Sequence, residues 1–437
     1  MDNYQKNLLS LFASKKAKIC IIGLGYVGLP LAISYANEGF EVIGIDIDIN
    51  KVRKINSGKS YINHIPSTKL STFTQNKRLV ATSEFNICKN VDAIIICVPT
   101  PLNKYREPNL NFIRGTLSSI NDFLKKGQIL SLESTTYPGT TKEEVLPKLK
   151  NKGFNVGKDF FLVYSPERED PGNKEFTTAN IPKIIGGITN NCRDVGLFLY
   201  KAIIKKVVPV KDTTTAEMTK LLENIHRAIN IGLMNELKPL ADKMEIDLYE
   251  VIEAAATKPF GFVPYYPGPG LGGHCIPIDP FYLTWKAREY GMHTRFIELA
   301  GEINSSMPTY VVDKISDALN KEGKPINKSN ILILGLSYKK NVDDMRESPS
   351  IEIIKLLKSK GSNVSYSDPY FKEFPKLRNS NFRMKNVKIN EKNLSNADAV
   401  ILITDHDDFD YQLIKKFSSL IIDTRGKYIP SSKIIRA

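Results

Sequence analysis

The segment GLGYVG at residues 23–28 has the glycine spacing of a turn that binds a dinucleotide. Gly23 permits a tight turn after a strand, Gly25 lets a pyrophosphate approach the backbone, and Gly28 lets the next helix pack closely on that strand. Asp46 ends the following strand-like run, where a carboxylate accepts hydrogen bonds from ribose hydroxyls and repels a 2′-phosphate. The pattern predicts binding of NAD rather than NADP; the alternative is a glycine turn that binds nothing.

One cysteine lies in a loop rather than in an apolar run. The segment GLGGHCIPIDP at 270–280 places three glycines and two prolines around Cys275, beside His274 and near Asp279. A thiol in that setting is a candidate nucleophile if polar or cationic neighbours favour the thiolate, and the alternative is an inert buried cysteine. Three other cysteines lie in or beside apolar runs and are expected to pack in the core, namely Cys20, Cys88 and Cys97.

Lys220 and Asn224 are four residues apart on a predicted long helix, so their side chains share one face. An ammonium and a carboxamide placed together can stabilise an oxygen that gains negative charge. The competing interpretation is a solvated lysine on a helix surface. Glu167, in the segment SPERE after a predicted strand, is a candidate general base or a group that positions water. A solvated loop carboxylate is the alternative.

Further polar side chains follow predicted strands. Thr100 in CVPTP and Thr135 in ESTTYPGTT fall at the carboxyl ends of two strands, where open α/β sheets bind their ligands. Each threonine alone is also typical of a turn. Later in the chain, Lys339 and Arg346 follow another strand, and Arg425 ends a further one. These cations are placed to reach phosphates.

The elements that must position these residues are visible as short apolar runs separated by helical patterns. Runs of this kind are typical of strands buried on both faces of a parallel sheet. The first set lies at 17–25, 40–48, 91–100, 127–135, 158–167 and 205–210. The second set lies at 329–339, 361–369, 398–406 and 418–425.

Between the two sets the sequence is helical. Asp212 is placed to cap a long helix that begins at about Thr213, and Pro239 should kink or end it. We therefore predict an α/β protein with two Rossmann-like, doubly wound parallel-sheet domains joined by a helical middle domain with a long linking helix. The expected domains are 1–211, 212–315 and 316–437.

Composition narrows the function classes. The chain has 437 residues, of which 42% are hydrophobic and 25% charged, as in folded globular proteins. Its net charge of +14 favours anionic partners, but no nucleic-acid-binding motif is present, so we expect no nucleic-acid partner. Five scattered cysteines without metal-ligand spacing argue against a disulfide framework or a metal site. No apolar run approaches the roughly 20 residues of a membrane span, so we expect a cytoplasmic chain without a membrane partner.

Taken together, the motifs resemble the UDP-glucose/GDP-mannose dehydrogenase family, in which they occur in the same order. The resemblance runs from about Lys16 to Arg425, nearly the whole chain. The segments that carry it are GLGYVGLP, CVPTP, STTYPGTT, SPERE, AEMTKLLENIHRAINIGLMNEL, PGPGLGGHCIPIDPFYL and GLSYKKNVDDMRESPS.

The resemblance implies an enzyme that oxidises the C6 alcohol of a UDP-sugar to a carboxylate in two NAD-dependent steps. A cysteine thiolate converts the intermediate aldehyde to a thiohemiacetal, and the thioester formed next is hydrolysed. It further implies that 1–211 binds NAD, that 212–315 carries the cysteine loop and a dimer contact, and that 316–437 binds UDP. A homodimer built on the linking helix is the expected assembly.

Residue roles follow from matching motif positions. The implied catalytic residues are Cys275, Lys220, Asn224, Asp279, Glu167 and Thr135. The implied cofactor-binding residues are Gly23, Gly25, Tyr26, Val27, Gly28, Asp46, Thr100, Thr135 and Arg346. The implied substrate-binding residues are Glu167, Arg168, Lys220, Asn224, Gly272, Gly273, Lys339 and Arg425.

The sugar is less sharply defined. The segment KPFGFVPYYPGPG at 258–270 is similar to that of UDP-N-acetylglucosamine 6-dehydrogenases, so UDP-N-acetylglucosamine is the expected substrate and its uronate would feed surface polysaccharide synthesis. UDP-glucose and UDP-N-acetylmannosamine remain alternatives, because they differ from it at C2 alone. A one-step hydroxyacid dehydrogenase is the rival of another class, although it would need neither the second α/β lobe nor the cysteine loop.

Overall fold

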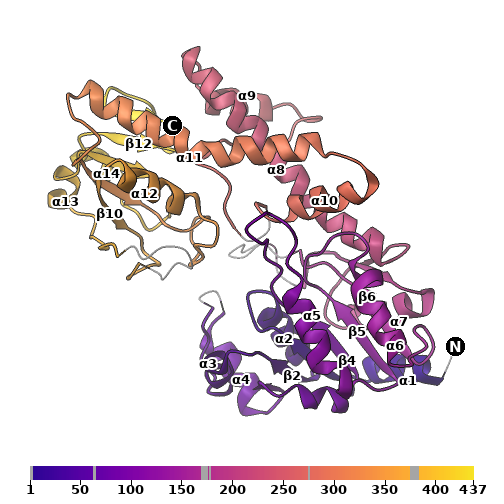
Figure 1. Cartoon of the computed structure of the whole chain (residues 1–437). Coiled ribbons are helices and arrows are strands. Elements are labelled where there is room, and N and C mark those ends of the chain that lie inside the picture. The colour runs from indigo at the N-terminus through magenta and orange to yellow at the C-terminus, as the bar shows by residue number, and fades with distance from the viewer. Residues whose placement is uncertain (1–2, 63–64, 169–175, 177–178, 274–275, 375–382) are drawn as a thin grey trace. The chain divides into compact units, whose positions relative to one another are not determined.

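The computed structural model describes residues 3–437 except 63–64, 169–175, 177–178, 274–275 and 375–382 (Figure 1). The chain forms two compact units, each described here by itself. The first consists of Met1–Glu223 with Phe281–His293, and the second consists of Asn224–Pro280 with Thr294–Ala437. The division falls within one long helix.

The first unit contains an eight-stranded sheet in the order β3-β2-β1-β4-β5-β6-β7-β8. Its strands are β1 (Lys18–Ile22), β2 (Glu41–Ile45), β3 (Leu79–Thr82), β4 (Ala93–Ile96), β5 (Gln128–Leu132), β6 (Phe160–Tyr164), β7 (Lys183–Gly187) and β8 (Val207–Pro209). All neighbouring pairs are parallel except β6 and β7, which are antiparallel. Every residue of β4, β5 and β6 is buried, as expected of strands covered on both faces.

Six of these strands lie within the predicted apolar runs. The sequence did not predict β3, which has four residues, or β7, whose apolar residues end in two glycines. The helices of this unit are α1 (Asn3–Ala13), α2 (Gly28–Asn37), α3 (Ile49–Asn56), α4 (Ser67–Gln75), α5 (Asn111–Ile120), α6 (Leu146–Asn151) and α7 (Asn190–Lys201). Alternation of strand and helix confirms the predicted doubly wound α/β class.

The second unit contains a five-stranded, wholly parallel sheet in the order β10-β9-β11-β12-β13. Its strands are β9 (Asn330–Leu334), β10 (Asn363–Ser367), β11 (Ala399–Leu402), β12 (Ile421–Asp423) and β13 (Ile434–Arg436). The flanking helices are α12 (Pro349–Ser359), α13 (Glu391–Ser395) and α14 (Tyr411–Phe417). Four strands lie in the predicted runs, whereas the three-residue strand β13 was not predicted.

The helical part consists of α8 (Thr213–Lys243), α9 (Leu248–Ala256), α10 (Asp279–Ala287) and α11 (Arg295–Lys321). Asp212 caps α8 as predicted, since its Oδ1 accepts the N–H of Thr215 at 2.8 Å. Pro239 does not end the helix, which continues to Lys243. The two compact units do not follow the expected domain ranges 1–211, 212–315 and 316–437, which stay a prediction.

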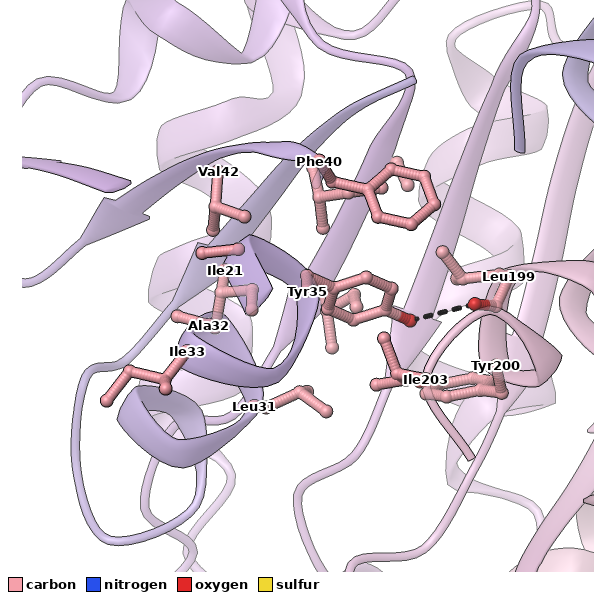
Figure 2. Packing of buried hydrophobic residues seen from close by; sticks show 14 of the residues in the cluster. Ile21, Leu31, Ala32, Ile33, Tyr35, Phe40, Val42, Leu199, Tyr200 and Ile203 are labelled. Carbon is pink, nitrogen blue, oxygen red and sulfur yellow. Dashed lines mark hydrogen bonds between the residues drawn. The ribbon is translucent and has the colours of Figure 1, made fainter. Parts of the chain in front are cut away.

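A tyrosine joins two helices in the core of the first unit. The side chain of Tyr35 on α2 is fully buried, and its hydroxyl donates to the carbonyl of Leu199 on α7 at 3.2 Å (Figure 2). Its ring meets Phe40 edge to face, with centroids 5.7 Å apart. Leu199 lies in the last turn of α7, where carbonyls have no partner within the helix. The hydroxyl therefore satisfies an acceptor that would otherwise be buried and unpaired.

We expect Tyr35→Phe to lower the free energy of unfolding by about 1 kcal/mol, because it removes only this hydrogen bond. Tyr35→Ala should cost about 3–5 kcal/mol, because it also leaves a cavity. Urea unfolding followed by tyrosine fluorescence and circular dichroism measures both. A Phe variant as stable as the unmodified protein would show that the hydroxyl contributes nothing.

Candidate active site

The turn after β1 has the geometry that the glycine pattern predicts. Gly23 has φ +94°, and a Cβ built there would lie 2.5 Å from the carbonyl oxygen of Cys97. A Cβ on Gly28 would lie 1.9 Å from the carbonyl oxygen of Gly23. Both positions therefore require glycine for the fold itself. Gly25 differs, because a Cβ there would meet nothing within 4 Å, which leaves its backbone open to a pyrophosphate.

The carboxylate of Asp46 is fixed against this turn. Its Oδ2 accepts the N–H of Leu24 at 3.0 Å, its Oδ1 accepts the N–H of Asp48 at 2.9 Å, and the side chain is 8% exposed. An Oδ1 with one hydrogen bond retains a lone pair for a ribose hydroxyl. The Nζ of Lys51 lies 3.4 Å from Oδ2, a contact that the sequence analysis missed. This cation partly offsets the repulsion that the carboxylate exerts on a 2′-phosphate.

The two threonines lie where the sequence places them. Thr100 follows β4 and Thr135 follows β5, and these strands pair in parallel, so both residues lie at the same edge of the sheet. The backbone there is tied together, because Ser134 Oγ donates to the carbonyl of Val98 at 2.7 Å. Tyr282 on α10 donates to the carbonyl of Thr100 at 3.0 Å. Thr100 is buried and Thr135 is half-buried.

Lys220 is not the solvated lysine that a helix surface usually carries. Its side chain is 6% exposed, and its Nζ lies 3.5 Å from Oε2 of Glu167, which is 13% exposed. The neighbouring Arg168 is bound on both sides, by Glu223 at 2.8 Å and by the carbonyl of Pro182 at 2.6 Å. The first unit thus places an ammonium and a carboxylate together at the carboxyl end of β6.

A buried charged network lies beneath Glu167. The Nζ of Lys183 lies 2.8 Å from Oε2 of Glu133 and 3.3 Å from the carbonyl oxygen of Pro166. Tyr200 donates to Oε1 of Glu133 at 2.5 Å. Glu133, Glu167 and Lys183 also line a cavity of about 20 Å³, the size that one water molecule needs. No sequence motif predicts a role for Glu133 or Lys183.

Glu217 connects the first turns of α8 to the loop after β5 by hydrogen bonds. Its carboxylate accepts the N–H of Gly139 at 2.6 Å, and the N–H and hydroxyl of Thr141 at 2.8 Å and 2.6 Å. Burial raises the pKa of Glu217 to about 7, outweighing these hydrogen bonds, which favour the ionised form. Because Glu217 lies one helical turn before Lys220, it fixes the part of α8 that carries the lysine.

In the second unit, Asn224 and Asp279 form a buried pair. Asn224 Nδ2 donates to Oδ2 of Asp279 at 2.5 Å, and both side chains are buried. Asp279 is the first residue of α10. Cys275, the predicted nucleophile, lies outside the described residues. The glycines before it are described: Gly273 donates its N–H to the carbonyl of Arg346 at 3.0 Å.

That glycine loop packs tightly on the loop after β9. Cβ atoms built on Gly272 and Gly273 would lie 2.5 Å and 2.9 Å from side-chain atoms of Tyr338. Only glycine therefore allows the two segments to approach so closely. Lys339, predicted to bind substrate, follows Tyr338 and is half-buried.

The other predicted cations of this unit also lie at the carboxyl ends of its strands. The guanidinium of Arg346 is 45% exposed and paired with Asp344 at 2.7 Å. Arg425, which follows β12, donates from Nε to the carbonyl of Ile403 at 2.6 Å. Arg346 follows β9 and Arg425 follows β12, two strands of one parallel sheet with β11 between them, so both cations follow carboxyl ends at the same edge of that sheet.

The predicted site residues are thus divided between the units. The first unit holds Gly23, Gly25, Tyr26, Val27, Gly28, Asp46, Thr100, Thr135, Glu167, Arg168 and Lys220. The second holds Asn224, Gly272, Gly273, Asp279, Lys339, Arg346 and Arg425. A single active site built from both sets stays a prediction.

In the described part of the chain, no group of three or more His, Cys, Asp or Glu side chains is arranged to hold a metal ion. None of the helices formed by the described residues combines the length and apolar character that crossing a bilayer needs.

Comparison with known proteins gives matches along almost the whole chain. Family models of the UDP-glucose/GDP-mannose dehydrogenases match in three parts: the NAD binding domain at 17–204, the central domain at 214–306 and the UDP binding domain at 332–430. A UDP-N-acetyl-D-mannosamine dehydrogenase of Methanococcus maripaludis is 35% identical over 90% of this chain and 87% of its own. A UDP-N-acetyl-D-glucosamine 6-dehydrogenase of Salmonella typhi is 33% identical over 91% and 92%.

A solved structure is similar throughout. The structure of a UDP-D-ManNAc dehydrogenase from Pyrococcus horikoshii superimposes with a TM-score of 0.86 at 32% identity, covering 96% of this chain and 98% of the other. The fold, the dinucleotide turn with Asp46 and these matches define an NAD-dependent oxidoreductase that acts on nucleotide sugars. The chain belongs to the UDP-glucose/GDP-mannose dehydrogenase family and is a UDP-sugar dehydrogenase.

Asp46→Ala should narrow the preference for NAD over NADP, because it removes the carboxylate that faces the 2′ position and leaves the cation of Lys51. We expect the ratio of kcat/KM for the two cofactors to fall by about tenfold, the effect of roughly 1.4 kcal/mol. Steady-state kinetics with each cofactor gives the ratio. Equal efficiency of NAD and NADP in the unmodified enzyme would contradict the role of Asp46.

The raised pKa of Glu217 predicts a pH-dependent stability. At pH values between the ordinary pKa of a glutamate and about 7, the folded state holds the Glu217 proton more tightly than the unfolded state does. The stability that this group contributes is therefore present at low pH and lost as the pH rises through about 7. The difference in Tm between the unmodified protein and Glu217→Gln should shrink between pH 5.5 and 8.5, measured by scanning fluorimetry. Glu236→Gln, an exposed change on the same helix, should show no such trend.

Proposed function

We propose that the protein oxidises C6 of UDP-N-acetylglucosamine to the carboxylate, with two molecules of NAD accepting the two hydrides. The observation that carries this proposal is the buried pair of Lys220 and Glu167 at 3.5 Å, in which Glu167 lines one cavity together with Val27 of the dinucleotide turn. A buried lysine beside a carboxylate is suited to proton transfer and to stabilising an alkoxide. Membership of the family supplies the reaction type.

In the first oxidation, the C6 hydroxyl loses its proton while the hydride leaves C6. Lys220 Nζ takes up the hydroxyl proton and passes one of its own to Oε2 of Glu167, 3.5 Å away, which releases it to solvent before the hydrolytic step. The ammonium and the amide of Asn224 stabilise the oxygen as its negative charge grows. Asp279 accepts from Asn224 Nδ2 and so orients that amide.

The second oxidation uses Cys275. Its thiolate adds to the C6 aldehyde, so that a C–S bond forms and the carbonyl oxygen becomes an alkoxide. Lys220 and Asn224 stabilise that alkoxide. Loss of the remaining C6 hydride then gives a thioester.

Hydrolysis completes the reaction. A water molecule attacks the thioester carbon, Glu167 accepts a proton from that water, and the C–S bond breaks to return the Cys275 thiolate. Thr135 and Glu167 position the water. The cavity between Glu167 and the Lys183–Glu133 pair is of the size that a single water needs.

UDP-N-acetylmannosamine is the second candidate substrate. Relatives from Methanococcus maripaludis and Pyrococcus horikoshii bear its name at 35% and 34% identity, close to the 33% of the Salmonella typhi enzyme named for the glucosamine epimer. Both candidates share the acetamido group at C2. Their common requirement is a pocket that pairs the amide N–H and C=O.

Complete conversion of a limiting amount of UDP-sugar should give about two NADH per sugar, because one site performs both oxidations. Absorbance at 340 nm gives the ratio, and Cys275→Ala should abolish formation of the acid. A ratio near one, with aldehyde accumulating, would instead support a one-step dehydrogenase.

The same assay with three sugars tests the substrate. UDP-N-acetylglucosamine should exceed UDP-glucose by about tenfold to a hundredfold in kcat/KM, because UDP-glucose leaves a buried polar partner unpaired at a cost of about 1–3 kcal/mol. UDP-N-acetylmannosamine presents the amide on the other ring face. If the manno epimer is the better substrate, the second candidate is correct. If UDP-glucose lies within a factor of two, both acetamido proposals fail.

We further propose that the second unit forms a homodimer through α8 and α11. On α8, Leu233 and Leu240 are exposed at a spacing of seven residues, so they share one helix face, and the exposed Met244 directly follows the helix. Phe296 and Leu299 are exposed on α11. The two helices pack together, since Asn235 Nδ2 donates to Asn304 Oδ1 at 2.8 Å. An apolar face of this kind is suited to a second copy of the chain.

Leu240→Glu should shift the protein from dimer to monomer, because it places a charge in that apolar face. Light scattering after size exclusion measures the mass. Ile429→Glu is the matched control, since Ile429 is exposed on a loop after β12. A monomeric unmodified protein would contradict the proposed dimer.

A further inference from the structure

A fully buried histidine lies beneath the loop that carries Lys339. His406 follows β11, and its imidazole has no exposed surface. It packs between the rings of Tyr370 and Phe409, at centroid distances of 5.0 Å and 5.4 Å. The proposed reaction gives this titratable group no role.

Both ring nitrogens of His406 have partners. The N–H of Asn341 donates to Nδ1 at 2.9 Å, and Nε2 lies 3.3 Å from Oδ2 of Asp368. A backbone N–H can only donate, so Nδ1 must be the accepting nitrogen of a neutral ring. The hydrogen-bond network therefore assigns the proton to Nε2, which donates to Asp368.

Asp368 binds the start of the loop that carries Lys339. Its Oδ2 accepts the N–H of Leu336 at 2.6 Å, and its Oδ1 accepts the N–H of Tyr370 at 2.7 Å. Burial opposes the charged form, but the hydrogen bonds from His406 and Leu336 hold the pKa of Asp368 below its ordinary value. Asp368 is thus an acceptor for His406 over the working range of pH.

These bonds fix the segment 336–341 at its two ends. Lys339 lies between Leu336, held by Asp368, and Asn341, held by His406. Within the loop, Ser337 Oγ donates to the carbonyl of Val342 at 2.6 Å. Asn341 has φ +61°, a left-handed conformation that a branched or bulky residue would resist. The buried histidine therefore holds the backbone N–H of Asn341, while Asp407 holds the same residue through its side-chain amide.

We propose that His406 is a positioning residue for the UDP part of the substrate, acting through the N–H of Asn341 to hold the backbone that presents Lys339. This inference rests on the proposed function and on the predicted role of Lys339 as a substrate-binding residue. His406 itself touches no substrate.

Two variants test the hydrogen bonds of the two ring nitrogens of His406 separately. In His406→Asn, the amide oxygen can take the place of Nδ1 and accept from Asn341, but the side chain is too short to reach Asp368. In His406→Gln, the amide N–H can take the place of Nε2 and donate to Asp368, but it leaves the N–H of Asn341 unpaired. His293→Gln, at an exposed position of the first unit, is the matched control.

The measurement is calorimetric titration of each full-length variant with UDP, and separately with NAD. We expect His406→Gln to weaken UDP binding at least about tenfold, the effect of one lost buried hydrogen bond, and His406→Asn to stay within about threefold. NAD affinity should be unchanged in all variants. If the two variants bind UDP equally, or if affinity simply follows Tm, the inference is overturned.

Amide hydrogen exchange of the same proteins tests the proposal without relying on affinity. In His406→Gln the peptide that contains Asn341 should exchange faster while the peptide that contains Leu336 stays protected. Equal protection of these two peptides in His406→Gln would overturn the inference. Two further outcomes distinguish failure of the proposed function from failure of this inference. If the unmodified protein binds no UDP, the proposed function fails. If Lys339→Ala weakens binding and His406→Gln does not, the inference alone fails.

Discussion

Both α/β lobes depend on a carboxylate that ends the second strand and accepts a backbone N–H from the turn after the first. In the first unit Asp46 accepts from Leu24, and in the second Asp368 accepts from Leu336. The bond closes the turn that follows the glycine, so it sets the position of everything the turn presents. A carboxylate is suited to this task because it accepts several N–H bonds and cannot donate.

The two carboxylates nevertheless differ in what remains open to a ligand. Asp46 is 8% exposed and has Lys51 as its third partner. The side chain of Asp368 has no exposed surface, and His406 is one of its partners, at 3.3 Å. The first turn can therefore offer its acid to a ribose, whereas the second uses its acid wholly to hold the loop that carries Lys339. One local geometry thus serves binding in one lobe and positioning in the other.

The sequence predicted the α/β class, ten of the strands and the helical middle, because buried parallel strands are continuous apolar runs. It did not predict β3, β7 or β13, which are short or end in glycine. Cys275 and the joint active site stay predictions. Glu217, Glu133, Lys183 and His406 were given no function, since a charged or titratable residue gains its role from partners far along the chain. Lys183, for example, is paired with Glu133, fifty residues away. No local pattern signals such a pair.

The buried Lys183–Glu133 pair illustrates what such partners do. Removing two charges from water is costly, and their attraction offsets that cost only when further hydrogen bonds are made. Here Tyr200 and the carbonyl of Pro166 supply them. Through the Pro166 carbonyl, the pair also holds the backbone directly before Glu167.

The reversed direction of β7 has an evolutionary consequence. Because β7 is antiparallel to β6, the chain leaves β6 and enters β7 at the same edge of the sheet, and no crossover helix has to span the sheet between Tyr164 and Lys183. Insertions or deletions in that connection need not reroute any strand. A change in its length leaves the pairing of β1 with β2 and β4, the strands beside the dinucleotide turn, in register. For protein engineering, a segment grafted into this connection should begin after Arg168, because Glu167 and Arg168 are bonded to Lys220 and Glu223 of α8.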